Sequence, residues 1–130
     1  MVIDSSALIA ILLGEPGSDD LVRTIARAGE RMVGAPTWVE ASAVMRARKG
    51  PGGELALDAL MERMTIQIVP LSVDAARLAR LGYARFGKGI GDPAVLNYGD
   101  CLAYGTAMAA ARPLLFVGDD FVHTDVDAAR

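Results

Sequence analysis

Cysteine and histidine are nearly absent from this sequence. It contains one cysteine, Cys101, and one histidine, His123. A single cysteine excludes an internal disulfide, and zinc sites built from several Cys or His side chains are excluded with it. A single histidine excludes chemistry that needs a pair of them. Such sparse use of cysteine is typical of a reducing compartment, so we expect an intracellular, cytoplasmic protein.

Long apolar runs and an excess of basic residues are also missing. The first apolar run, residues 7–13, is too short to span a bilayer, and Asp4 precedes it where a signal peptide would carry Lys or Arg. We therefore expect a soluble protein with no membrane contact. Thirteen Lys and Arg against sixteen Asp and Glu give a net charge of −3. A generally basic surface for nucleic acid is not expected, and any such contact would need a local basic patch or metal ions.

Aromatic side chains make up only 5% of the 130 residues, whereas hydrophobic residues as a whole make up 52% and charged residues 22%. This composition is typical of a globular protein with an aliphatic core rather than of a disordered chain. The length suits one domain, and no repeat or linker divides the sequence. A single domain over residues 1–130 is expected.

Short apolar segments alternate with segments in which apolar residues recur at helical spacing. The expected strands are residues 1–4, 32–35, 66–71 and 113–118. The expected helices are residues 5–12, 18–28, 36–49, 54–64, 72–85 and 100–108, with a glycine-rich loop over residues 86–98. This alternation predicts an α/β fold, a three-layer sandwich in which helices flank both faces of a central, mostly parallel sheet.

Four acidic residues fall at or near the points where expected strands end and helices begin. They are Asp4, Glu40, Asp100 and Asp119. Because the carboxyl ends of parallel strands meet at one edge of a sheet, these side chains are expected to gather in one crevice. Carboxylates gathered without His or Cys suit Mg²⁺ or Mn²⁺, and the natural chemistry of such a site is phosphodiester hydrolysis. An acid at a helix start is also a common capping residue, and that interpretation stays open for each of them.

Four motifs resemble, in order and spacing, those of the PIN domain family, and within it the VapC-type ribonuclease toxins of bacterial toxin–antitoxin pairs. The motifs are residues 2–8 (VIDSSAL), 36–40 (PTWVE), 97–104 (NYGDCLAY) and 114–121 (LLFVGDDF), the last followed by Thr124-Asp125. The first motif alone has little specificity, whereas the third and fourth together are fairly specific. The resemblance covers essentially the whole chain and implies a PIN-like fold.

The resemblance also implies an endoribonuclease that depends on Mg²⁺ or Mn²⁺ and cleaves tRNA, rRNA or mRNA. By position, Asp4 and Asp100 would be the principal metal ligands and Glu40 would complete the acidic site. Asp119 or Asp120 would supply a fourth acid, and Asp119 is favoured because it is nearer the end of the expected strand. The family further implies inhibition by a VapB-type antitoxin, and we expect a homodimer.

Three further groups of polar residues have two open interpretations each. Ser6 would orient Asp4 through its hydroxyl, or cap the first helix. Two basic groups would grip RNA phosphates, or form solvated helix faces. They are Arg46, Arg48 and Lys49, and Arg77, Arg80, Arg85 and Lys88.

Other functions of an acidic α/β protein fit the sequence less well. A phospho-receiver would carry an acidic pair near the N-terminus and a late lysine, but no lysine follows Lys88. A haloacid-type phosphatase would carry Asp-x-Asp after the first strand, where this chain has Asp4-Ser5-Ser6. The remaining alternative is a catalytically inactive PIN-fold module that acts through an antitoxin or RNA, and such a module should show no stabilisation by Mn²⁺.

Overall fold

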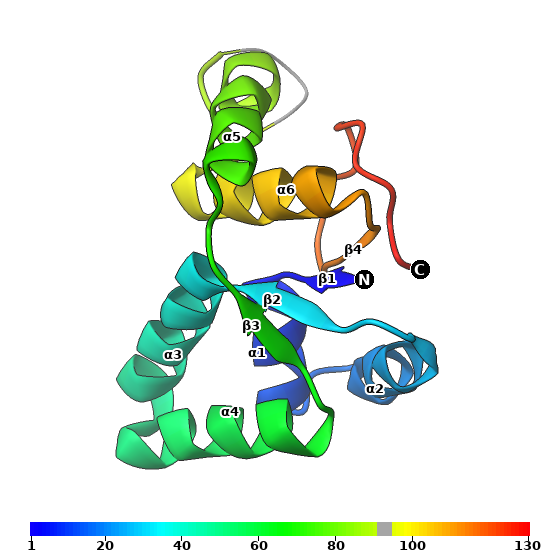
Figure 1. Ribbon diagram of the computed structural model, residues 1–130. Helices are drawn as coiled ribbons and strands as arrows, with labels where there is room; N and C mark the ends of the chain where they lie inside the picture. The colour runs from blue at the N-terminus through cyan, green and yellow to red at the C-terminus, as the bar shows by residue number, and fades with distance from the viewer. Residues whose placement is uncertain (91–94) are drawn as a thin grey trace.

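The computed structural model describes residues 1–90 and 95–130 (Figure 1). Within these residues four short strands form one sheet, in which every neighbouring pair is parallel and the spatial order is β3-β2-β1-β4. The strands are β1 (Val2–Ile3), β2 (Met32–Gly34), β3 (Gln67–Val69) and β4 (Leu114–Leu115). Because β1 lies between β2 and β4, the segments that follow these three strands meet at one edge of the sheet.

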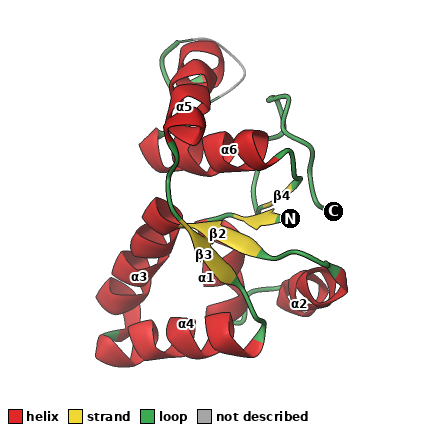
Figure 2. Cartoon of the chain, viewed as in Figure 1, coloured by secondary structure: helices red, strands yellow, loops and turns green. Residues whose placement is uncertain are grey.

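Helices cover both faces of the sheet (Figures 1 and 2). One face carries α1 (Ser5–Leu12), α2 (Ser18–Arg27), α3 (Ala35–Lys49) and α4 (Pro51–Arg63), and the other carries α5 (Val73–Phe86) and α6 (Tyr98–Ala110). Adjacent strand residues point to opposite faces: Ile3 belongs to the core on the α1 side, whereas Val2 belongs to the core on the α6 side. The predicted α/β three-layer sandwich is confirmed. Across the described ranges, none of the helices has the length and apolar character needed to cross a bilayer.

The strands are shorter than the sequence predicts, and three helices begin earlier, α3 by one residue at Ala35. α4 begins at Pro51 rather than at residue 54, because Gly50 ends α3 with a φ of 68° and proline is favoured at a first helical position. α6 begins at Tyr98 rather than at Asp100. The expected glycine-rich loop is therefore shorter at both ends, and its residues 91–94 lie outside the described ranges.

The backbones of α5 and α6 approach each other closely at Gly105. A Cβ at this position would collide with the carbonyl oxygen of Ala75 and would lie 2.7 Å from the backbone nitrogen of Ala79. Only a glycine permits this contact without moving one helix. The close packing of α6 on α5 fixes where the first turn of α6 lies relative to the sheet edge.

Candidate active site at the carboxyl edge of the sheet

Asp4 follows β1 directly and is the N-cap residue of α1. One of its oxygens, Oδ2, accepts hydrogen bonds from the backbone nitrogen of Ser6 (3.1 Å) and from the Ser6 hydroxyl (2.6 Å). The residue is only 3% exposed, and its other oxygen, Oδ1, is buried and has no hydrogen-bond partner within the described ranges. Burial raises the pKa of Asp4, against the opposing effect of the Ser6 hydrogen bonds, and the charge of Glu40 raises it further. Ser6 thus makes the contact with Asp4 that the sequence suggested.

Glu40 projects from the second turn of α3, the helix that follows β2. Its Oε1 accepts a hydrogen bond of 2.9 Å from the hydroxyl of Ser5. The other side of the carboxylate packs against Gly99 in the first turn of α6, where a Cβ would come within 2.9 Å of Glu40 Cδ. Ser5 and Gly99 were not singled out as site residues from the sequence, although each adjoins a predicted acid. That adjacency is the signal that could have found them. Ser5 hydrogen-bonds to the Glu40 carboxylate, and Gly99 leaves the space that the carboxylate occupies.

Asp100 occupies the third position of α6, where it completes a capping box with Asn97. The Asn97 side chain accepts a hydrogen bond from the Asp100 backbone nitrogen (2.8 Å), and Asp100 Oδ2 accepts one from the Asn97 backbone nitrogen (3.1 Å). The pKa of Asp100 is raised from 3.8 to about 7. Burial is the main cause, the Asn97 hydrogen bond opposes it, and the charges of Asp4, Asp120 and Glu40 add to it. Asp100 therefore lies within the electrostatic reach of three other acids.

The Asp119–Asp120 doublet lies on the exposed segment that follows β4. Because β4 ends at Leu115, Asp119 is four residues beyond the strand and not at its end, as the sequence suggested. The charge of Asp120 contributes to the raised pKa of Asp100. The same segment is tied to the site through the Val117 backbone nitrogen, which donates a hydrogen bond of 3.0 Å to the Ser6 hydroxyl. The choice of Asp119 as the fourth acid stays a prediction.

The donor set at this edge fits a hard divalent cation held by few protein ligands. In the ranges 1–90 and 95–130, no three Asp, Glu, His or Cys side chains lie close enough together to enclose one ion. Mg²⁺ commonly retains several waters and binds one or two carboxylates together with substrate phosphates. The buried Oδ1 of Asp4, which lacks a partner in the part of the chain that the structure describes, is an oxygen of the type such an ion takes. Asp4 and Asp100 are thus suited to hold Mg²⁺ or Mn²⁺.

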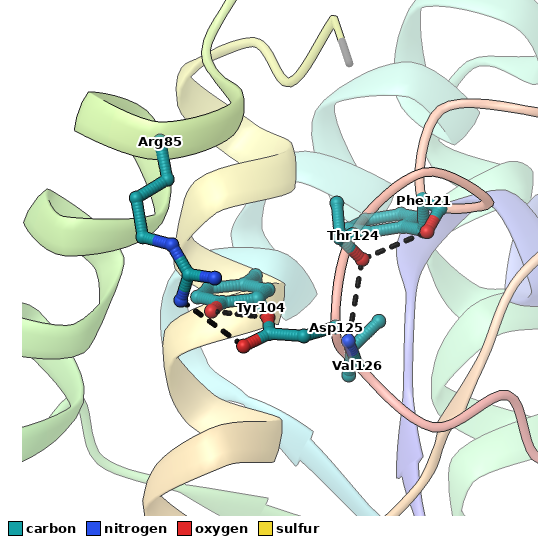
Figure 3. A network of polar contacts seen from close by, with 6 residues as sticks. All are labelled: Arg85, Tyr104, Phe121, Thr124, Asp125 and Val126. Carbon is teal, nitrogen blue, oxygen red and sulfur yellow. Dashed lines mark hydrogen bonds and ion pairs between the residues drawn. The ribbon is translucent and has the colours of Figure 1, made fainter. Parts of the chain in front are cut away.

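A polar network holds the C-terminal segment against α5 and α6, as Figure 3 shows. The hydroxyl of the buried Tyr104 donates to Asp125 Oδ1 at 2.7 Å, and Arg85 donates to Asp125 Oδ2 at 3.1 Å. Burial and the bond to Asp125 raise the pKa of Tyr104 to about 12. Burial acts to raise the pKa of Asp125, but the hydrogen bonds from Tyr104 and Arg85 outweigh it and lower that pKa. This network anchors the segment that carries Asp120.

Replacing Tyr104 with Phe is expected to lower the free energy of unfolding by about 1–2 kcal/mol, because it removes a partly buried hydrogen bond to a charged acceptor. Urea unfolding would measure the change. The matched control is Tyr83→Phe, since the exposed Tyr83 hydroxyl bonds to the Lys88 carbonyl at 3.2 Å and to no charged acceptor among the described residues. Equal stability of the two variants would show that the bond to Asp125 does not anchor the segment.

The four basic residues predicted near the loop fall into two classes. Arg85 forms the ion pair with Asp125 and also lies over the ring of Phe86, with its Cζ 4.6 Å from the ring centroid. Arg77 pairs with Asp74 on its own helix. The other two, Arg80 and Lys88, line a cavity between α5 and α6.

Comparison with known proteins places this arrangement in a family. The PIN domain family matches residues 1–127. Ribonuclease VapC28 of Mycobacterium tuberculosis is 41% identical over 129 residues, which cover 99% of this chain and 97% of that protein. Ribonuclease VapC42 of the same species is 40% identical over 129 residues, which cover 99% of this chain and 98% of the relative.

Comparison with solved structures gives the same fold. The crystal structure of Mycobacterium tuberculosis VapC20, a toxin that cleaves the sarcin–ricin loop, superposes with a TM-score of 0.76 at 15% sequence identity. The match covers 96% of this chain and 95% of that one. At this identity it supports the fold alone. On the family match and on the two relatives of 40% identity or more, the chain belongs to the PIN domain family and, within it, to the VapC ribonuclease group.

Proposed function

We propose that this protein is an endoribonuclease toxin that hydrolyses RNA phosphodiester bonds with the help of Mg²⁺ or Mn²⁺. Asp4 and Asp100 would hold the ion, Glu40 would complete the acidic site, and Asp119 or its neighbour Asp120 would add a fourth carboxylate. The observation that supports this most is the buried Oδ1 of Asp4, which has no partner among residues 1–90 and 95–130, although Asp100 is close enough for the charge of Asp4 to raise its pKa. The VapC relatives, whose names describe ribonucleases, support the same reaction.

Three of these carboxylates are each held by a group of their own. Ser6 fixes one oxygen of Asp4 and does not contact the other, Ser5 fixes one oxygen of Glu40, and the backbone amide of Asn97 fixes one oxygen of Asp100. When bound, the cation would supply the positive charge that activates a water molecule and stabilises charge on the phosphate. The chain's own contribution is to keep the carboxylates oriented before substrate arrives.

We further propose a VapB-type antitoxin as partner, a homodimer as the working form, and the cytoplasm as the location. Membership of the VapC group supports the antitoxin. The alternative of an inactive PIN-fold module is less favoured, because carboxylates are present at all four predicted positions.

The test is cleavage of a mixed pool of single-stranded and structured RNA by the purified chain, with Mg²⁺ or Mn²⁺ compared with EDTA. We expect cleavage only with metal, and loss of that cleavage in Asp4→Asn. Asp58→Asn is the matched control, since Asp58 is an exposed aspartate on α4 that should not affect the reaction. Thermal unfolding with and without Mn²⁺ would be measured on the same samples.

Each outcome decides between the two functions. Metal-dependent cleavage by the wild type and by Asp58→Asn, but not by Asp4→Asn, would support the enzyme. Stabilisation by Mn²⁺ without cleavage of the pool would support the metal site and point to a narrow RNA target. If the pool is not cleaved and Mn²⁺ does not stabilise the protein, the enzyme function is overturned and the binding module is favoured.

A further inference from the structure

A cavity of about 780 Å³ lies between α5 and α6, and it ends beside the acidic edge. Its walls combine the aliphatic side chains of Leu71 and Leu102 with two tyrosines, Tyr83 and Tyr98. The volume lies in the range of small-ligand sites. Tyr98 is the first residue of α6 and stands two residues before Asp100, so the cavity and the Asp100 carboxylate share one turn of helix.

Tyr98 is the most exposed large apolar side chain described, with 79% of its surface accessible. It lines the cavity between α5 and α6 and also a smaller one of about 400 Å³ on the Glu40 side. Tyr104 on the same helix, by contrast, is 1% exposed. A tyrosine ring that borders both cavities beside an acidic site offers a free aromatic surface to whatever occupies the site.

The charged residues of the cavity are both positive. Arg80 and Lys88 line it, and no Asp or Glu is found among its lining residues within the described ranges. In the same ranges neither cation forms an ion pair, whereas Arg77 and Arg85 on α5 both do. Two cations that have no ion-pair partner among the described residues and that line the same cavity as two tyrosines are complementary to a phosphate attached to a base.

We propose that this cavity seats a nucleotide of single-stranded RNA, with its base stacked on Tyr98 and its phosphate held by Arg80 and Lys88. The proposal rests on the proposed ribonuclease function and assigns the substrate class of that site. A second copy of the chain fits the cavity less well. A twofold interface there would bring the Arg80 and Lys88 side chains of both copies together, and no acid is found among the lining residues that the structure describes.

The test measures binding, not cleavage, so that it can fail separately from the proposed enzyme. Labelled ten-nucleotide oligouridylate and oligoadenylate would be titrated in EDTA, with fluorescence anisotropy as the readout. Tyr98→Ala is expected to weaken binding about 5- to 150-fold, the size of one lost base–aromatic stack, whereas Tyr98→Phe keeps the ring and should bind within about twofold of wild type.

The cations are tested by the salt dependence of the same binding. Arg80→Gln is expected to reduce the slope of log affinity against log salt by about one, because one phosphate contact is lost. Arg77→Gln is the matched control on the same helix, and it should leave the slope unchanged because Arg77 is paired with Asp74.

Three results would overturn the proposal. The first is equal binding by the wild type and Tyr98→Ala, and the second is equal affinity for a duplex of the same length. The third is a shift of Tyr98→Ala from dimer to monomer in sedimentation with RNA binding unchanged, which would assign the cavity to a second copy.

Discussion

Asp100→Asn is expected to abolish RNA cleavage and, in the absence of metal, to make the protein more stable at pH 8. The folded pKa of Asp100 is about 7, compared with 3.8 for the free side chain. At pH 8 folding therefore moves an ionised carboxylate into surroundings that disfavour its charge. A difference of three pKa units corresponds to about 4 kcal/mol, which we reduce to about 1–2 kcal/mol because the group is only half-buried. Asn retains an oxygen that can accept the Asn97 amide hydrogen bond.

The pH dependence has a definite sign. A raised folded pKa means that the native state holds its proton more tightly than the unfolded state does, so wild-type stability falls as pH rises from about 4 to 7. Burial raises the pKa of Asp4 as well, and that effect acts in the same direction. Below pH 4 Asp100 is protonated in both the folded and the unfolded state, and the stability gain of Asp100→Asn should disappear.

Urea unfolding at pH 4, 6 and 8 in EDTA would measure this gain, with Asp58→Asn as the control that should show none. Mn²⁺ should stabilise the wild type at pH 8 more than it stabilises Asp100→Asn, because the ion favours the ionised carboxylate. A variant that still cleaves RNA, or that is no more stable than wild type at pH 8, would contradict the role assigned to Asp100.

The strand-end rule explains why the sequence located Asp4 correctly. Residues 2–3 are apolar and Asp4 is the first polar side chain after them, so the end of β1 could be predicted from the sequence. The same rule misplaced Asp119, because β4 pairs only over Leu114–Leu115 and the apolar residues after it lie outside the ladder. Strand length depends on pairing partners, and these are not visible in a local apolar pattern.

The start of α6 shows a second limit. Glycines around residue 99 indicated a loop, yet Tyr98 and Gly99 form the first turn of the helix because Asn97 caps it. Contacts between residues far apart in the chain could not be predicted from the sequence either. Nothing local to Arg85 or Arg80 distinguishes them, but Arg85 lies against Asp125, forty residues away, and Arg80 lines a cavity.

The second large effect is expected from Gly99→Ala, which should reduce cleavage about 10- to 100-fold while changing stability by less than about 1 kcal/mol. Alanine favours the helix over glycine, so the fold itself gains slightly. The added Cβ, however, would lie 2.9 Å from Glu40 Cδ and 3.0 Å from its Oε1. The carboxylate must turn away and lose its bond to Ser5, and small displacements of this kind are costly for catalysis.

Gly52→Ala is a closely matched control. Gly52 occupies the second position of α4 as Gly99 occupies the second position of α6, and a Cβ at Gly52 would meet nothing within 4 Å. It should gain helix stability and retain full cleavage. A double-mutant cycle with Glu40→Ala then isolates the mechanism, since Gly99→Ala should add no further loss once the Glu40 carboxylate is gone. Additive losses in that cycle would mean that Gly99 acts on Asp100 or on RNA rather than through Glu40.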